Sequence, residues 1–110
     1  KQIYTEVFSE NNIDILAFPS TLVPANKLND QNLHRLDGKD VPYLIASSHN
    51  VQPATLCGSP GLTLPIGLTS NKLPIAIGFD APPNADRKLL SIGMAYEKIK
   101  PEISPPRSST

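Results

Sequence analysis

The chain has 110 residues, and its ten basic and ten acidic side chains give a formal charge of zero. This length suffices for one domain, and the lack of a basic excess argues against binding to nucleic acid or to an anionic membrane. A single cysteine excludes an internal disulfide framework. The sequence shows neither a signal peptide nor an apolar stretch of membrane-spanning length, so we expect a soluble, cytoplasmic protein.

Two elements are predicted at the N-terminal end. Residues 1–11 have helical spacing, which places Ile3, Val7 and Phe8 near one face. Residues 13–18 form a short apolar run that a proline ends. This second pattern predicts a buried strand.

The middle of the chain predicts one helix and two strands. Residues 20–38 are polar and predict a surface excursion. Residues 41–50 predict a helix in which Pro42 has to occupy the first turn. Residues 62–66 and 73–79 are predicted strands, and the polar turn between them predicts an antiparallel hairpin.

The second strand of this hairpin has two unlike faces. Ile75, Ile77 and Phe79 fall on one face, because side chains alternate along a strand. Ala76 and Gly78 fall on the other face. These small residues let another element approach closely.

The last predicted helix has the clearest signals. Asn84 can act as its N-cap, Asp86 places a negative charge in the first turn, and Pro101 stops the helix. The order of all predicted elements indicates α/β or α+β packing. An apolar stripe at helical spacing is formed by Ala85, Leu89, Ile92, Gly93, Tyr96 and Ile99, and Leu90 and Met94 widen it.

A long uncharged segment lies in the centre of the chain. Residues 41–71 contain no Lys, Arg, Asp or Glu. A short chain buries only a modest part of its own surface, so this segment predicts packing on a partner polypeptide, or that the chain is one end of a longer protein. The alternative is a disordered linker, because proline and serine are frequent here.

Two residues are candidate nucleophiles. Ser59 lies between glycines, but a nucleophile elbow needs Gly where Cys57 stands, and an extended segment follows instead of a helix. Cys57 would need a base, and no pattern places His34 or His49 beside it. We therefore interpret Ser59 as part of a tight turn and Cys57 as a buried structural residue.

No metal, phosphate or cofactor site is predicted. The two histidines and the scattered carboxylates lack the spacing of metal ligands. Asp37 and Asp40 are interpreted as part of a solvated turn instead of an acid–base pair. The glycines lack the Lys-Ser pair and the helix of a phosphate loop. The residues alone therefore give no complete catalytic constellation.

The segment from Pro53 to Ile99 resembles the C-terminal part of the amidase-signature hydrolases. It carries a small-Gly-x-Pro-Gly turn at 57–61, a Pro-x-Gly strand end at 65–67 and a Leu-Pro-Ile-Ala-Ile strand at 73–77. Upstream, the run from Ile13 to Ser20, with Asp14 as its acidic residue, resembles another strand and turn of that family. The stretch FDAPPNADRKLLSIG is most similar to the branch of indoleacetamide and mandelamide hydrolases.

This resemblance implies a fold and a reaction. The fold is α/β: residues 1–100 are a C-terminal segment of the amidase-signature domain, a mixed β-sheet sandwiched by helices, and they supply a hairpin and a closing helix. Residues 101–110 are a polar Pro/Ser-rich tail. The reaction is amide hydrolysis by a Lys–Ser–Ser triad whose second Ser is joined by a cis peptide. The triad belongs to a Gly/Ser-rich region that precedes this segment in the family, so no catalytic residue and no cofactor is assigned to the chain.

The resemblance also implies partners and a pocket wall. The N-terminal catalytic portion of the same enzyme, as a separate chain or a missing segment, and a small-molecule amide are the expected partners, and a homodimer stays open. Ser48, Thr55 and Cys57 are candidate substrate-binding residues, although all three could merely pack. Thr55 stands where many members carry Asn, which puts a contact there in doubt. Two alternatives remain: a non-catalytic module that binds a partner through residues 41–71, and a structural subunit of an amidotransferase complex.

Overall fold

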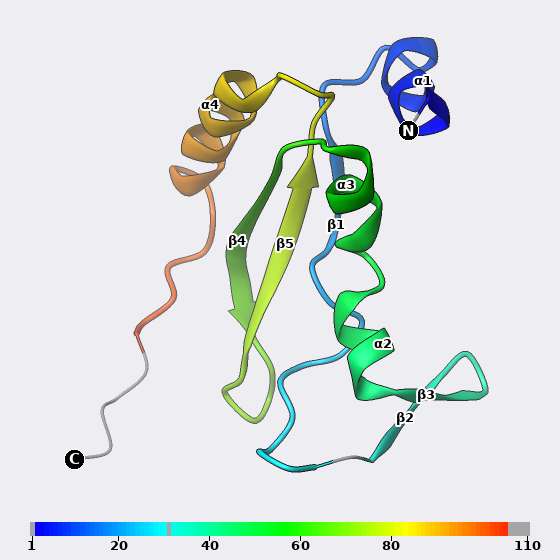
Figure 1. The fold of residues 1–110 in the computed structure, drawn as a ribbon. Helices are drawn as coiled ribbons and strands as arrows, with labels where there is room; N and C mark the ends of the chain where they lie inside the picture. The colour runs from blue at the N-terminus through cyan, green and yellow to red at the C-terminus, as the bar shows by residue number, and fades with distance from the viewer. Residues whose placement is uncertain (1, 31, 106–110) are drawn as a thin grey trace.

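The computed structural model of the chain describes residues 2–30 and 32–105 (Figure 1). Helices and antiparallel strands occur together, which confirms the predicted α/β class. In chain order the elements are α1 (Gln2–Glu10), β1 (Leu16–Pro19), β2 (Leu33–Leu36), β3 (Lys39–Pro42), α2 (Tyr43–Ser48), α3 (Gln52–Cys57), β4 (Gly61–Leu68), β5 (Pro74–Asp80) and α4 (Asp86–Glu97).

The strand β5 is the centre of a sheet with the order β1-β5-β4. Both of its pairings are antiparallel, and Phe79 lies opposite Ala17 on one side and Leu62 on the other. The predicted hairpin is therefore confirmed as β4–β5. Its register shifts between Pro65 and Gly67, where β4 carries a bulge.

A core lies between α4 and this sheet. Phe79 and Leu89 are buried there, and the ring of Phe79 meets that of Tyr96 edge-on with centroids 5.5 Å apart. Gly93 lets α4 come close to β4, because a Cβ at this position would collide with Leu62. The small residue Gly93 of the predicted stripe thus sets the distance between helix and sheet.

The ends of α4 differ from the prediction. Asn84 was expected to be the N-cap, but Ala85 occupies that position and no side chain caps the helix. Asn84 instead adopts a left-handed conformation with φ 68°, which asparagine tolerates better than most residues. Asp86 lies in the first turn as predicted, whereas Ile99 lies beyond the helix and is 81% exposed.

The end of the polar excursion 20–38 and the residues that follow it contain regular structure that the sequence reading missed. Strands β2 and β3 form a second antiparallel pair. Asp37 and Gly38 connect them with positive φ values of 46° and 75°, the conformation that a two-residue type I′ turn requires. The Oδ1 atom of Asp40 forms an exposed ion pair with the Nη1 atom of Arg35 at 3.1 Å. The interpretation of a solvated turn is therefore confirmed.

Two short helices replace the single helix predicted over residues 41–50. Pro42 ends β3 and precedes α2, because its fixed φ suits the position before a helix. The helix α3 was not predicted; it begins beside Pro53 and ends at Gly58, which adopts φ 68°. In Figure 1, α2 and α3 lie across the sheet from α4.

The strand β1 is not buried as predicted. Its residues alternate between half-buried and exposed, because β1 is an edge strand of the sheet. The ring of Phe18 nevertheless packs against β5: a Cβ built on Gly78 would lie 2.6 Å from its Cε2 atom. The predicted close approach at the small face of β5 is thus confirmed.

Large apolar side chains remain uncovered on several helices. Leu44 on α2 is 76% exposed and Leu56 on α3 is 82% exposed, and Leu90 and Met94 are exposed on α4. The chain exposes 8351 Å² in all, whereas a monomeric globular protein of this mass exposes about 6,000 Å². Within the described residues, no helix has the length and apolar character needed to cross a membrane.

Candidate functional site

The three candidate substrate-binding residues lie on the α2–α3 pair. The hydroxyl of Ser48 donates to the carbonyl of Leu44 at 2.7 Å, and that of Thr55 donates to the carbonyl of Val51 at 3.0 Å. Each hydroxyl is therefore bonded to its own helix, as is common for Ser and Thr one turn along. Cys57 is a half-buried free thiol at the end of α3.

A polar cavity of about 250 Å³ lies between α3 and the sheet. Thr55 lines it, but Ser48 and Cys57 do not belong to its lining, so the structure does not bring the three candidates into one cavity. Their contact with a substrate stays a prediction. The cavity is lined by Phe18, Val51, Ala54, Thr55, Ser59, Gly61, Leu62, Thr63, Gly78 and Asp80.

The charged group of this cavity is the carboxyl of Asp80 at the end of β5. The residue as a whole is only 4% exposed, and the carboxyl Oδ2 accepts a hydrogen bond from the Tyr4 hydroxyl at 2.6 Å. Burial raises the pKa of Asp80, and the hydrogen bond from Tyr4 opposes that rise in part. Burial, the hydrogen bond and the nearby negative charge raise the pKa of Tyr4 far above its usual range, so Tyr4 keeps its proton.

Ser59 lies in the same cavity, where its buried hydroxyl has no hydrogen-bond partner among the described residues. Neither histidine lines the cavity: His34 lies in β2 against the ring of Tyr43, and His49 follows α2. Ser59 therefore has no imidazole base in this cavity.

Across residues 2–30 and 32–105, no three His, Cys, Asp or Glu side chains gather in a way that could hold a metal ion.

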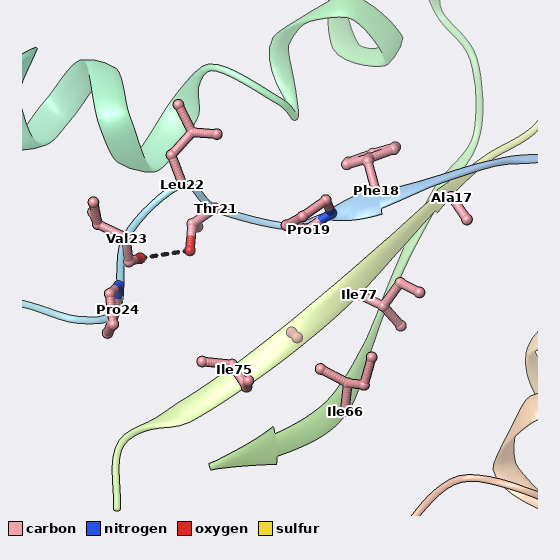
Figure 2. A pocket seen from close by; sticks show the side chains of 11 residues that line it. Ala17, Phe18, Pro19, Thr21, Leu22, Val23, Pro24, Ile66, Ile75 and Ile77 are labelled. Carbon is pink, nitrogen blue, oxygen red and sulfur yellow. Dashed lines mark hydrogen bonds between the residues drawn. The ribbon is translucent and has the colours of Figure 1, made fainter. Parts of the chain in front are cut away.

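A second, apolar pocket of about 440 Å³ lies at the other end of β1 (Figure 2). Phe18 and Pro19 line it from β1, and Ile66, Ile75 and Ile77 line it from β4 and β5. The hydroxyl of Thr21, which also lines it, donates to the Val23 carbonyl at 2.7 Å. This pocket can accommodate an apolar group, but its lining offers no charged side chain.

The sequence reading missed the pairing of Tyr4 with Asp80. The two residues are 76 positions apart, so no local pattern connects them. A weak signal exists, because Asp80 directly follows the apolar strand predicted over residues 73–79. A carboxylate that ends a central strand requires a buried partner or an opening to water.

Comparison with known proteins gives a consistent result. The family model described as Amidase matches residues 1–90. The indoleacetamide hydrolase of Agrobacterium vitis is 33% identical over 95 residues, which are 86% of this chain and 20% of that protein. The mandelamide hydrolase of Pseudomonas putida is 30% identical over 99 residues, which cover 89% of this chain and 18% of that protein.

A further relative carries a different name. A glutamyl-tRNA(Gln) amidotransferase subunit of Tropheryma whipplei (strain Twist) is 29% identical over 103 residues, or 94% of this chain and 18% of that protein. The chain thus spans about a fifth of the length of the curated relatives it matches. The resemblance read from the turn and strand motifs, with its similarity to indoleacetamide and mandelamide hydrolases, is confirmed. Because the family model covers most of the sequence, the chain belongs to the amidase family.

Proposed function

We propose that this chain is part of an amide hydrolase that cleaves a small aryl or alkyl carboxamide to an acid and ammonia or an amine. The observation that carries the proposal is the match of the Amidase model over residues 1–90, together with relatives named for the hydrolysis of indoleacetamide and mandelamide. The proposal includes a cytoplasmic location, which suits a chain with one unpaired cysteine.

The proposed chemistry divides between this chain and the rest of the enzyme. A serine oxygen bonds to the amide carbon, the C–N bond breaks as the nitrogen takes a proton, and water then hydrolyses the acyl-enzyme. The Ser, the cis-linked Ser and the Lys that do this lie outside the chain. The internal hydrogen bonds of Ser48 and Thr55, and the lack of a histidine beside Ser59, support leaving nucleophilic attack to other residues.

The remainder of the same enzyme is the proposed partner of the uncovered helix faces. Leu44 and Leu56 project from the α2–α3 pair, and Leu90 and Met94 from α4. Covering one such side chain contributes about 1.5–3 kcal/mol. These faces therefore fit association with a larger body, in which α2 and α3 form one wall of the substrate site.

The apolar pocket of Figure 2 supports an aryl or alkyl substrate. Its volume of about 440 Å³ is within the range that small-molecule sites occupy, roughly 300–1,000 Å³. All of its lining residues except Thr21 are apolar, and they come from β1, β4, β5 and the loop at residues 21–24. Such a lining selects for an apolar group next to the amide.

A segment exchange tests the proposal. In the Agrobacterium vitis indoleacetamide hydrolase, the 95 matched residues are replaced by the corresponding residues of this chain, and hydrolysis of indoleacetamide, mandelamide and a simple alkyl amide is measured by ammonia release. We expect hydrolysis of at least one aryl amide. A folded chimera that is inactive toward all three amides contradicts the proposal, as does amidase activity of the 110-residue chain alone.

The second candidate function is a component of an amidotransferase, which the similarity to the Tropheryma whipplei protein favours. The matched control is the same exchange made in that protein. Retained amidotransferase activity in this control, with no activity in the hydrolase chimera, would favour the second candidate. Stable binding of the chain to an unrelated protein, without activity in either chimera, would favour a non-catalytic interaction module.

A further inference from the structure

The carboxyl of Asp80 has acceptor capacity that the described residues do not use. Its Oδ2 accepts the Tyr4 hydroxyl at 2.6 Å, the short length typical of a hydrogen bond to an ionised oxygen. Its Oδ1 receives no hydrogen bond from any described residue. This atom lies beside the backbone of Gly61, which lines the polar cavity, because a Cβ there would be 3.1 Å from it. A further donor can therefore reach Oδ1 from the cavity.

No positive charge among the described residues compensates this carboxylate. The ion pairs within residues 2–30 and 32–105 belong to other carboxylates, those of Asp14, Asp40 and Glu97. The lining of the cavity contains no Lys, Arg or His. Tyr4 keeps its proton, so it donates a hydrogen bond without bringing a charge.

A buried carboxylate of this kind requires a partner. Asp80 is 4% exposed, and aspartate is almost never buried to this degree unless it is paired. Burial raises the pKa of Asp80, which is the effect of taking a charge out of water without full compensation. A cation beside Oδ1 would supply the missing compensation and would keep the strong hydrogen bond from Tyr4.

The cavity offers a second acceptor for the same partner. The hydroxyl of Ser59 lines it and is buried with no hydrogen-bond partner among the described residues. The hydroxyl of Thr63 lines it as well. Each hydroxyl oxygen has two lone pairs that can accept hydrogen bonds. The cavity therefore suits a group with several N–H donors.

The size of the cavity and its apolar residues favour an organic cation over a metal ion. Its volume of about 250 Å³ has room for a guanidinium or ammonium head and part of a stem. Ala54 and Leu62 provide apolar contacts for such a stem, and the ring of Phe18 can attract a cation to its face. Ca²⁺ and Mg²⁺ need about six oxygen ligands, whereas the described residues contain no cluster that could hold a metal ion.

We propose that the cavity beside Asp80 is a binding site for a nitrogen cation, a guanidinium or alkylammonium group that donates to Oδ1 of Asp80 and to the hydroxyl of Ser59. This chemistry has two sources. One is an Arg or Lys side chain from the part of the complete protein that this chain does not span, and the other is a free amine or guanidine ligand. The site does not depend on the proposed amide hydrolysis.

Methyl NMR of the complete protein that contains this chain tests for a site that is open to free ligands. The methyl groups of Ala54, Thr55 and Thr63, which line the cavity, are labelled with ¹³C and observed while methylguanidinium is added. Methylurea is the matched control ligand, because it has nearly the same shape but no charge. For an open site, methylguanidinium should shift these signals saturably in the wild type. Methylurea should not shift them, and neither should methylguanidinium in Asp80→Asn.

A site that is filled by a side chain of the protein itself gives a different result. Methylguanidinium then leaves the signals unchanged, and Asp80→Asn should raise the equilibrium constant of unfolding about 100-fold or more, because a buried cation loses its partner. Asn can still accept the hydrogen bond from Tyr4. Asp40→Asn is the matched control variant; its ion pair with Arg35 is exposed, so the constant should change less than about fivefold.

A crystal structure of the complete protein identifies the partner in this second case. A nitrogen of Lys or Arg should lie within about 4 Å of Oδ1 of Asp80. This measurement uses the wild type, so it decides the question even if Asp80→Asn does not fold.

Three results would overturn the proposal. Equal shifts with methylguanidinium and methylurea would show that the cavity does not select a charge. The absence of a shift, combined with an effect of Asp80→Asn no larger than that of Asp40→Asn, would show that Asp80 has no cationic partner. Water, a metal ion or a neutral side chain beside Oδ1, in a protein that methylguanidinium does not bind, would show the same.

Discussion

Gly78 is the position where the packing of the sheet allows the least addition. It lies on the central strand β5, and the ring of Phe18 from β1 covers it. A Cβ at Gly78 would lie 2.6 Å from Cε2 and 2.9 Å from Cζ of that ring. Carbon atoms attract at about 3.5–4.0 Å, so both contacts are strongly repulsive. The substitution Gly78→Ala therefore forces Phe18 or the edge strand to move.

The cost of Gly78→Ala combines two opposing effects. Overpacking of this kind costs about 1–3 kcal/mol. Replacing a glycine in a strand by alanine stabilises the fold by about 0.5–1 kcal/mol, because the unfolded chain then has less conformational entropy to lose. We expect a net loss of about 1–2 kcal/mol in the free energy of unfolding, which lowers Tm by roughly 4–16 °C.

Thermal unfolding followed by circular dichroism measures this loss. Gly67→Ala in β4 is the matched control, because a Cβ there meets Ile75 only at 3.8 Å, an ordinary contact, and should leave Tm unchanged or slightly higher. In a Phe18→Leu background the smaller side chain should relieve most of the cost of Gly78→Ala. The packing argument is refuted when Gly78→Ala is as stable as Gly67→Ala, or when its cost is the same with Leu at position 18.

Three further substitutions test other parts of the fold. Phe79→Ala removes the buried ring that meets Tyr96 edge-on and should cost about 3–5 kcal/mol in urea unfolding; a cost below about 1 kcal/mol would contradict a core at this position. Leu90→Ala and Met94→Ala should each change the free energy of unfolding of the isolated chain by less than about 0.5 kcal/mol but destabilise the complete protein. Equally small effects in the isolated chain and in the complete protein would show that nothing covers α4. Gly38→Ala, at φ 75°, should cost about 1–2 kcal/mol, and NMR shifts should change around β2–β3 alone; a neutral substitution would contradict the type I′ turn.

The sequence was sufficient for the elements that local patterns define. The β4–β5 hairpin follows from two apolar runs with a polar turn between them, and α4 follows from the spacing of Leu89, Gly93 and Tyr96. The close approach at Gly78 was also predictable, because a small residue in a central strand leaves room for a neighbour. The hairpin and α4 depend on residues that are near one another in the chain, whereas the partner of Gly78, Phe18 in β1, is distant in the sequence.

Other features depend on choices that local patterns do not decide. Asn84 suits both an N-cap and a left-handed turn, and the two prolines before it favoured the turn. The Asp37–Gly38 pair is a strong hairpin signal, but the residues around it are polar, so no apolar pattern indicated β2 and β3. The pairing of Tyr4 with Asp80 joins distant parts of the sequence, so it emerges only from the tertiary fold.

The position of β1 at the edge of the sheet has a consequence for synthesis on the ribosome. Leu16 pairs with Asp80 and Pro19 with Ile77, so each residue of β1 leaves the ribosome about sixty residues before its partner. At about 5–20 residues per second, β1 waits roughly 3–12 s as an unpaired apolar strand. Pro19 has no amide hydrogen to offer an intruding strand, which shortens the segment available for mispairing during that interval.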